Sequence, residues 1–319
     1  KKMKALTRDA VKQLWSEGDS TDGYALNGHN RGIEVVADPT CWSVLPGART
    51  STSAPQLRSL DLSFNRISAI GPLVLAPLVE LRDFKGYSNK ITNEGIESCG
   101  LERLVRLECL ELHDNALTQP PATLASSPSS GGGGGGGGGP SKLRVLRLER
   151  NRLVTLRHLS RCASLTHLSV DGNRLRGLTE DDSEVSSSNP HAAASGGGFR
   201  GGGGGSAAAT ATAATMTAGA AWLSACSSLE FLSCADNEIE RLPSRALQGP
   251  RSTLKELVLS RNALGDGALR GLAPLGGCLE RLHLEGNHLG SLDHLPPLRA
   301  LLELFVQGNR LVLSAAAAA

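Results

Sequence analysis

The strongest constraint on the fold of this chain is a frame of apolar residues that recurs along the sequence. The copy at residues 254–264 reads Leu-Lys-Glu-Leu-Val-Leu-Ser-Arg-Asn-Ala-Leu, or L-x-x-L-x-L-x-x-N-x-L in general form. Nine copies occur, and their asparagines are Asn65, Asn89, Asn115, Asn151, Asn173, Asn237, Asn262, Asn287 and Asn309. Such self-similarity indicates an array of stacked units, each of which contacts mainly its neighbours.

Each frame predicts one short strand, one turn and one return segment. In the L-x-L centre both leucines point inward and the residue between them points outward, because side chains alternate along a strand. The asparagine amide can donate and accept, so stacked asparagines are expected to form a ladder that satisfies turn backbone groups. Parallel strands need crossovers, which are right-handed. The predicted fold class is α/β: a right-handed solenoid (horseshoe) of about nine repeats, with a concave parallel β-sheet and convex 3₁₀ or short helices.

Two unusually long separations between consecutive asparagines coincide with low-complexity sequence. Residues 126–141 contain nine consecutive glycines, and residues 180–221 are rich in Ser, Gly, Ala and Thr. Such segments bury too little apolar area to offset the entropy cost of ordering. We expect two disordered insertions in a solenoid spanning residues 56–313, followed by an Ala-rich tail at 314–319.

Residues 1–55 do not fit the frame and are predicted to form a helical cap with an irregular lead-in. Thr7 is a candidate N-cap for a short helix. The apolar face of this helix comprises Leu6, Val11, Leu14 and Trp15. A cap is needed because the first repeat would otherwise expose its apolar edge. Further on, Ile33, Val35 and Val36 are expected to form one degenerate strand.

Charge and composition exclude several classes of partner. The chain has 319 residues, 33 of them basic and 31 acidic, for a net charge of +2. This balance gives no reason to expect nucleic acid or an anionic membrane as a partner. The longest apolar runs cover only a few residues, too short to cross a bilayer, and residues 1–20 have no hydrophobic signal region. The seven cysteines are odd in number and scattered, which favours reduced thiols and a cytoplasmic location.

Other motifs give little support for a chemical site. The glycine run ends at Gly139-Pro140-Ser141-Lys142 and lacks the G-K-[ST] of a phosphate-binding loop, and the Phe199-Arg200 pair lies between glycines as in a linker. The group His283, Glu285 and His288 does not have the H-E-x-x-H spacing of a zinc site.

Cys109 and His113 are expected on one exposed face, without the pocket and oxyanion site that catalysis requires. We therefore expect no enzyme activity, cofactor, metal or small-molecule substrate.

The outward strand positions are the better candidates for function. Exposed aromatic side chains interleaved with arginine and carboxylates are typical of protein-binding hot spots. The predicted protein-binding residues are Phe64, Lys85, Tyr87, Glu111, His113, Arg147, Glu149, His167, Phe231, His283 and Phe305. The sequence thus predicts a partner protein of unknown identity, bound on the concave face.

The nine frames resemble the leucine-rich repeat superfamily over about residues 56–313. Two spacings between consecutive frame asparagines, Asn151–Asn173 and Asn287–Asn309, are 22 residues long. Such 22-residue units look like the class found in the nuclear regulator of protein phosphatase 1 and in many ciliary and axonemal scaffolds. The stretch Leu6-Thr7-Arg-Asp-Ala-Val-Lys-Gln-Leu14 is similar to the helical caps of axonemal members, including radial-spoke-type proteins. This resemblance implies a non-catalytic protein–protein interaction scaffold, with a ciliary, axonemal or cytoskeletal assembly as its setting. A regulatory subunit of a protein phosphatase is one alternative, and an unrecognised enzyme using Cys109, His113 or His283 is another.

Overall fold

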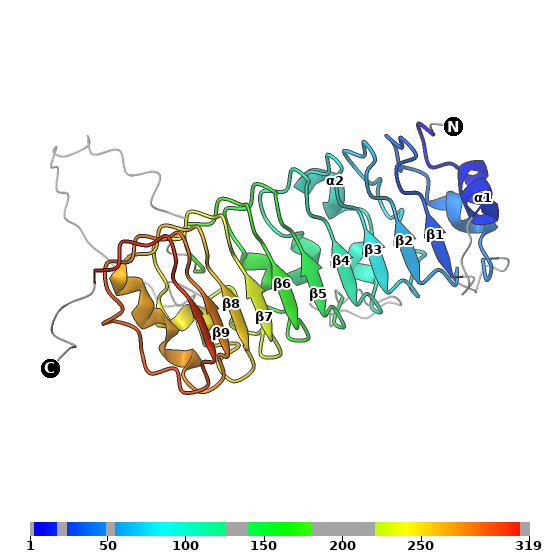
Figure 1. Cartoon of the computed structure of the whole chain (residues 1–319). Coiled ribbons are helices and arrows are strands. Elements are labelled where there is room, and N and C mark those ends of the chain that lie inside the picture. The colour runs from blue at the N-terminus through cyan, green and yellow to red at the C-terminus, as the bar shows by residue number, and fades with distance from the viewer. Residues whose placement is uncertain (1–2, 18–23, 49–54, 126–139, 180–220, 313–319) are drawn as a thin grey trace, which may run out of the picture.

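The computed structural model describes residues 3–17, 24–48, 55–125, 140–179 and 221–312. They form an elongated array whose strands run parallel and pair in sequence order, β1 to β10 (Figure 1). The strands are β1 (Ala25–Asn27), β2 (Ser59–Asp61), β3 (Asp83–Lys85), β4 (Cys109–Glu111), β5 (Val145–Arg147), β6 (His167–Ser169), β7 (Phe231–Ser233), β8 (Glu256–Val258), β9 (Arg281–His283) and β10 (Glu303–Phe305). The predicted parallel-sheet solenoid is confirmed.

The register of the sheet follows the leucine frame. The central residue of each strand is the second leucine of the frame or its equivalent, and these residues align from strand to strand, as in Leu60–Phe84–Leu110. All three side chains are fully buried. Because every strand is only three residues long, the sheet itself supplies few hydrogen bonds per repeat, and leucine packing between neighbouring repeats holds the array together.

The predicted asparagine ladder is present. Asn262 Oδ1 accepts from the N–H of Ile239 at 3.0 Å, and its Nδ2 donates to the carbonyl of Cys234 at 2.9 Å, both in the preceding repeat. All nine frame asparagines make this pair of bonds to the unit before them. The ladder therefore fixes the spacing of consecutive repeats.

The residue before each asparagine has a left-handed backbone, with φ of 55° at Phe64 and 53° at Asp114. Glycine occupies the same position as Gly172, Gly286 and Gly308. The N–H of Phe64 donates to the carbonyl of Tyr87 at 3.1 Å, so the turn is itself bonded to the next repeat. This conformation is uncommon for residues with a side chain and persists here because the neighbouring repeats hold it.

The start of the solenoid differs from the prediction. β1 lies inside residues 1–55, the segment predicted to be cap and lead-in, and pairs with β2. In the described part of the chain the sheet therefore has ten strands, and the expected nine repeats are preceded by one more. The degenerate strand expected at Ile33, Val35 and Val36 is wrong. Ile33 is buried, while Val35 and Val36 make only isolated bridges, to Ala5 and Ile70. This first unit escaped notice because Leu26 is the only leucine at a position of the frame.

Helices lie behind the sheet and at its N-terminal end (Figure 1). The N-terminal helix α1 (Arg8–Glu17) is capped as predicted, since the Thr7 hydroxyl accepts from the N–H of Ala10 at 3.3 Å. The return segments hold α2 (Asn93–Glu97) and the 3₁₀ helices η1 (Pro39–Val44), η2 (Leu101–Arg103), η3 (Ala122–Ala125), η4 (Arg157–Leu159), η6 (Ser244–Leu247) and η7 (Asp266–Leu275). Among the described residues, no helix combines the length and the apolar composition needed to cross a membrane.

The predicted insertions and the Ala-rich tail lie almost entirely outside the described residues, as do the glycine run and Phe199-Arg200. At the far end of the second insertion, Trp222 and Leu223 are buried in the core. The disorder predicted for these segments stays a prediction.

Candidate protein-binding face

The outward-pointing side chains of the ten repeats form one continuous surface, here called the strand face. Each repeat contributes four positions to it: the residues flanking the central strand residue, and the two residues just before the frame asparagine. In the repeat of β4 these are Cys109, Glu111, His113 and Asp114. All eleven predicted binding residues occupy such positions, so the structure places them on one surface of the molecule.

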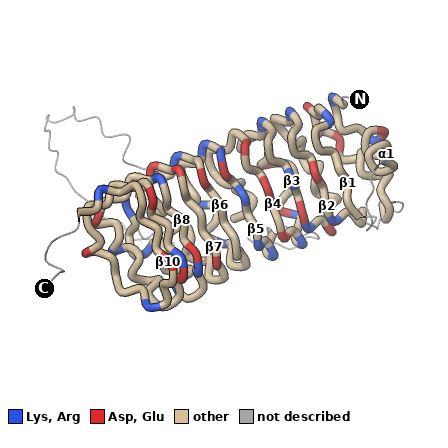
Figure 2. Tube along the Cα trace, in the orientation of Figure 1, with Lys and Arg blue, Asp and Glu red and all other residues tan. Residues whose placement is uncertain are grey.

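The strand face is acidic although the chain is not. Its carboxylates are Asp61, Asp83, Glu111, Asp114, Glu149, Asp171, Asp236, Glu256, Glu285 and Glu303. Its cations are Lys85, Arg147, Arg150, Arg261 and Arg281. With neutral histidines these ten negative and five positive charges give a net charge of −5, whereas the whole chain is at +2. Figure 2 shows the acidic residues recurring on successive strands. The overall charge balance therefore conceals a local excess of carboxylates.

Four rings form a continuous row across the first repeats, here called the aromatic row. His29 contacts Phe64 with ring centroids 5.0 Å apart, and Phe64 meets Tyr87 edge-on at 5.5 Å. Tyr87 stacks on His113 at 4.2 Å with an angle of 15° between the planes. Phe64 remains 51% exposed. His29 was missed from the sequence because it belongs to the unrecognised first repeat.

The remaining predicted rings lie in two separate pairs. His167 stacks on Phe231 at 5.9 Å between β6 and β7, and His283 stacks on Phe305 at 4.5 Å between β9 and β10. The predicted residues are therefore not one cluster. The structure groups them into the aromatic row with Lys85 beside it, a charged centre at β4–β7, and a C-terminal pair.

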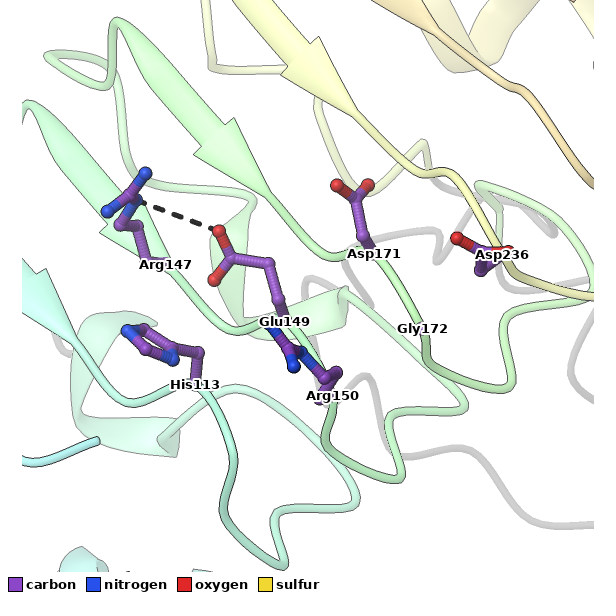
Figure 3. A pocket seen from close by; sticks show the side chains of 7 residues that line it. All are labelled: His113, Arg147, Glu149, Arg150, Asp171, Gly172 and Asp236. Carbon is purple, nitrogen blue, oxygen red and sulfur yellow. Dashed lines mark ion pairs between the residues drawn. The ribbon is translucent and has the colours of Figure 1, made fainter. Parts of the chain in front are cut away.

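Two adjoining hollows open on the strand face at β4–β7. The turn-side hollow has a volume of about 640 Å³ and is lined by His113, Arg147, Glu149, Arg150, Asp171, Gly172 and Asp236 (Figure 3). The strand-side hollow has a volume of about 420 Å³, and Glu111, His167 and Phe231 are in its lining. Arg147, Glu149 and Asp171 line both hollows, so the two form one depression.

Arg147 lies at the centre of this depression. Its guanidinium is 3.8 Å from a carboxylate oxygen of Glu111 and 3.6 Å from Glu149 Oε1. The second oxygen, Glu149 Oε2, is buried and has no hydrogen-bond partner. A buried carboxylate oxygen without a donor is costly, since it has given up hydration without a replacement. The depression therefore holds unused acceptor capacity.

Asp171 is the main residue missing from the predicted set. Its Oδ1 accepts from the Ser233 hydroxyl at 2.6 Å and from the N–H of Ala235 at 2.8 Å, which orients the carboxylate. Its position in the outward column of the frame was the available signal. What could not be read from the sequence is that it shares a hollow with Glu149, because that depends on how neighbouring side chains fill the face.

His113 connects the aromatic row to the depression. Its Nδ1 is 2.8 Å from Asp114 and its Nε2 is 3.8 Å from Glu111. Burial lowers the pKa of His113, but its interactions with the carboxylates of Glu111 and Asp114 outweigh burial and raise the pKa above the ordinary value. The nearby imidazole of His113 lowers the pKa of Glu111 in turn.

The candidate residues for catalysis and metal binding lie in ordinary contacts with neighbouring carboxylates. Burial raises the pKa of Cys109 to about 11, so its sulfur is a protonated thiol at neutral pH and a poor nucleophile. Its Sγ lies 3.8 Å from Glu111 Oε1. His283 lies 3.6 Å from each of Glu256 and Glu285. In the described part of the chain, no group of three His, Cys, Asp or Glu residues is arranged to hold a metal ion.

Comparison with known proteins supports the fold strongly and the function little. Two leucine-rich repeat family profiles match, one at residues 56–78 and one at residues 252–273. The comparison with curated protein sequences returns no match.

Similar solved structures include a leucine-rich repeat protein of Leptospira interrogans, the leucine-rich repeat domain of APL1B, and TLR13 in a complex with ssRNA13. The identities are 19%, 20% and 17%, with TM-scores of 0.53, 0.57 and 0.62. They cover 88%, 98% and 95% of this chain, which spans 60%, 69% and 38% of theirs.

At such identities the structures establish the fold alone. The nine frames, the asparagine ladder and the ten-stranded parallel sheet agree with the two matched profiles and with these repeat structures. The chain belongs to the leucine-rich repeat superfamily.

Proposed function

We propose that this chain is a non-catalytic scaffold that binds a partner protein on its strand face. The observation that carries the proposal is the combination, on one face, of the aromatic row with the charged depression at β4–β7. Leucine-rich repeat folds commonly serve as protein-interaction scaffolds. A surface with exposed rings beside partly desolvated charges is the composition that protein interfaces use for hot spots.

The rigidity of the face supports the same proposal. The asparagine ladder holds each turn to the preceding repeat. The backbone N–H of the residue before the asparagine, as at Phe64, donates to a carbonyl of the following repeat. A preorganised face binds with a smaller entropy cost than a flexible one, so modest contacts can give useful affinity.

Co-purification tests the proposal. The tagged full chain is used to capture partners from a cell extract, and the bound proteins are identified by mass spectrometry. A variant with Tyr87→Ala, Arg147→Ala and Phe231→Ala removes the ring and charge contacts of the face. We expect this variant to stay folded and to lose the captured protein.

A matched control carries Val105→Ala and Arg161→Ala, since both side chains are exposed and lie outside the strands. It is expected to capture the same protein as the native chain. Retention of the partner by the folded strand-face variant would refute the proposal.

The identity of the captured protein separates the alternatives. Structural proteins would favour a scaffold in a ciliary or cytoskeletal assembly, and a phosphatase catalytic subunit would favour a regulatory role. A cytoplasmic location is part of the proposal. It is compatible with the seven cysteines, which are all free thiols.

A further inference from the structure

The chemistry of the strand face narrows the kind of group that a partner presents, and this inference rests on the proposed function. The face carries a net charge of −5 on a chain of net charge +2. The two hollows are themselves lined by more carboxylates than cations: Glu111, Glu149, Asp171 and Asp236 against Arg147 and Arg150. A partner group that enters the depression will be favoured if it is positively charged.

The internal cations do not use all of the acceptors in the depression. Arg147 is shared between Glu111 and Glu149 and reaches only Oε1 of the latter. Glu149 Oε2 stays buried without a donor. If the carboxylate turns toward the hollow, a side chain that brings hydrogen-bond donors to this oxygen will relieve a cost already present in the free protein.

Asp171 offers a second carboxylate in the same depression. Its Oδ1 accepts from the Ser233 hydroxyl and the N–H of Ala235, and its Oδ2 accepts from the Ser169 hydroxyl at 3.4 Å; these donors fix its orientation but contribute no positive charge. The carboxylates of Glu149 and Asp171 rise on the same side of the ribbon in Figure 3, and both residues line both hollows. Two oriented carboxylates thus face one space.

We propose that this depression binds an arginine side chain from an extended segment of the partner protein, with its guanidinium hydrogen-bonded to Glu149 and Asp171. Arginine fits better than lysine because its planar fork of five N–H donors can serve two carboxylates at once, whereas lysine is a compact and strongly hydrated charge. Phe231 lines the strand-side hollow and offers a ring on which the guanidinium can stack. The aromatic row, which reaches the depression at His113, gives the neighbouring residues of the segment an apolar surface.

The test uses a small probe on the intact chain. N-acetyl-arginine-N-methylamide is titrated into the ¹⁵N-labelled protein, and the backbone amide signals of Asp171, Gly172 and Ala235 are followed by NMR. The expected result is saturable shifts at these amides. The citrulline analogue has nearly the same shape without the charge and should produce no saturable shift. The lysine analogue should bind several-fold more weakly.

Paired variants locate the binding. Glu149→Gln with Asp171→Asn keeps the shapes of both side chains, and the amide oxygen introduced by Asp171→Asn could still accept from Ser233 and Ala235. The dissociation constant of the arginine probe should rise at least about tenfold, as expected when charge-assisted hydrogen bonds are lost. The matched control, Asp83→Asn with Glu303→Gln, removes two carboxylates elsewhere on the face and should change the constant less than about twofold.

Three results would overturn the proposal: equal shifts with the citrulline analogue, no saturable shift with the arginine probe, or equal weakening by the two double variants. The last result would indicate general attraction to an acidic surface. Failure of the proposed function is distinguishable from these, because it would appear as partner capture that does not depend on the strand face while the probe still binds.

Discussion

The ring of Tyr87 stacks on the ring of His113 at 4.2 Å, and His113 in turn lies between Glu111 and Asp114. The stacking joins an apolar stretch of the strand face to its charged centre across two repeats. The histidine is thereby held in a fixed orientation with a carboxylate near each ring nitrogen. A titratable group consequently lies at the boundary between the two parts of the proposed interface.

His113 should make stability depend on pH. Its pKa in the folded chain is raised above the unfolded value of about 6.5. The stabilisation from its protonated form is therefore fully present below about pH 6.5 and is lost as pH rises through the higher folded pKa. We expect the free energy of unfolding of the native chain to fall relative to His113→Gln across this interval. Urea unfolding of both chains at pH values from about 5.5 to 8.5 measures the difference, and a constant difference would contradict the assignment.

Asn151 should contribute much more to the free energy of unfolding than its exposed neighbour Arg152. Its Oδ1 accepts from the N–H of Leu117, and its Nδ2 donates to the carbonyls of Leu112 and Leu148. Asn151→Ala would leave the buried N–H of Leu117 without a partner, at about 1–3 kcal/mol for an unsatisfied group, whereas the carbonyls of Leu112 and Leu148 keep the side-chain donors of Asn115 and Asn173. We predict that the free energy of unfolding measured with urea falls by about 1–3 kcal/mol. The control Arg152→Ala, at an exposed position, should change stability by less than about 0.5 kcal/mol.

Two glycines in η7 should respond very differently to alanine. A Cβ at Gly271 would come within 1.7 Å of the carbonyl oxygen of Leu242 in the preceding repeat, whereas a Cβ at Gly267 meets nothing within 4 Å. The carbonyl is main chain and cannot move aside cheaply, so Gly271→Ala is expected to cost at least about 1–3 kcal/mol. Gly267→Ala should be close to neutral. Thermal unfolding of both variants decides the matter, and equal melting temperatures would show that the return segments are not packed this closely.

Cys109 should react slowly in the folded protein. Burial raises its pKa to about 11, so the thiolate that attacks alkylating agents is scarce at pH 7.5. Iodoacetamide followed by peptide mass spectrometry should show Cys109 modified far more slowly in the native chain than in urea. Rapid native modification would reopen the interpretation of Cys109 and His113 as a catalytic pair. The same measurement on His113→Ala provides the control, since a histidine-activated thiol would slow down in that variant.

The solenoid follows from the sequence alone. The frame leucines specify one buried strand per unit, and each asparagine amide bonds both to its own turn and to the unit before it, so repeat spacing and parallel pairing follow from local chemistry. Leu254–Leu264 shows this well, since its buried leucines and the bonds of Asn262 are those the frame predicts. The first repeat was not recognisable, because Leu26 alone does not make a frame.

The candidate site was only partly predictable. Alternation of side chains along the strands placed Glu149, His113 and Phe231 on the exposed face. The outward positions, however, show no repeating sequence pattern from which their mutual contacts could be predicted. Only the folded chain shows that Tyr87 stacks on His113 and that Asp171 shares a hollow with Glu149. Folding also sets where charge accumulates, since carboxylates far apart in sequence come together only when repeats stack at strand spacing. The fold thus follows from a short sequence pattern that recurs in every repeat. The candidate site depends on side-chain contacts that differ from repeat to repeat, so only the tertiary structure decides them.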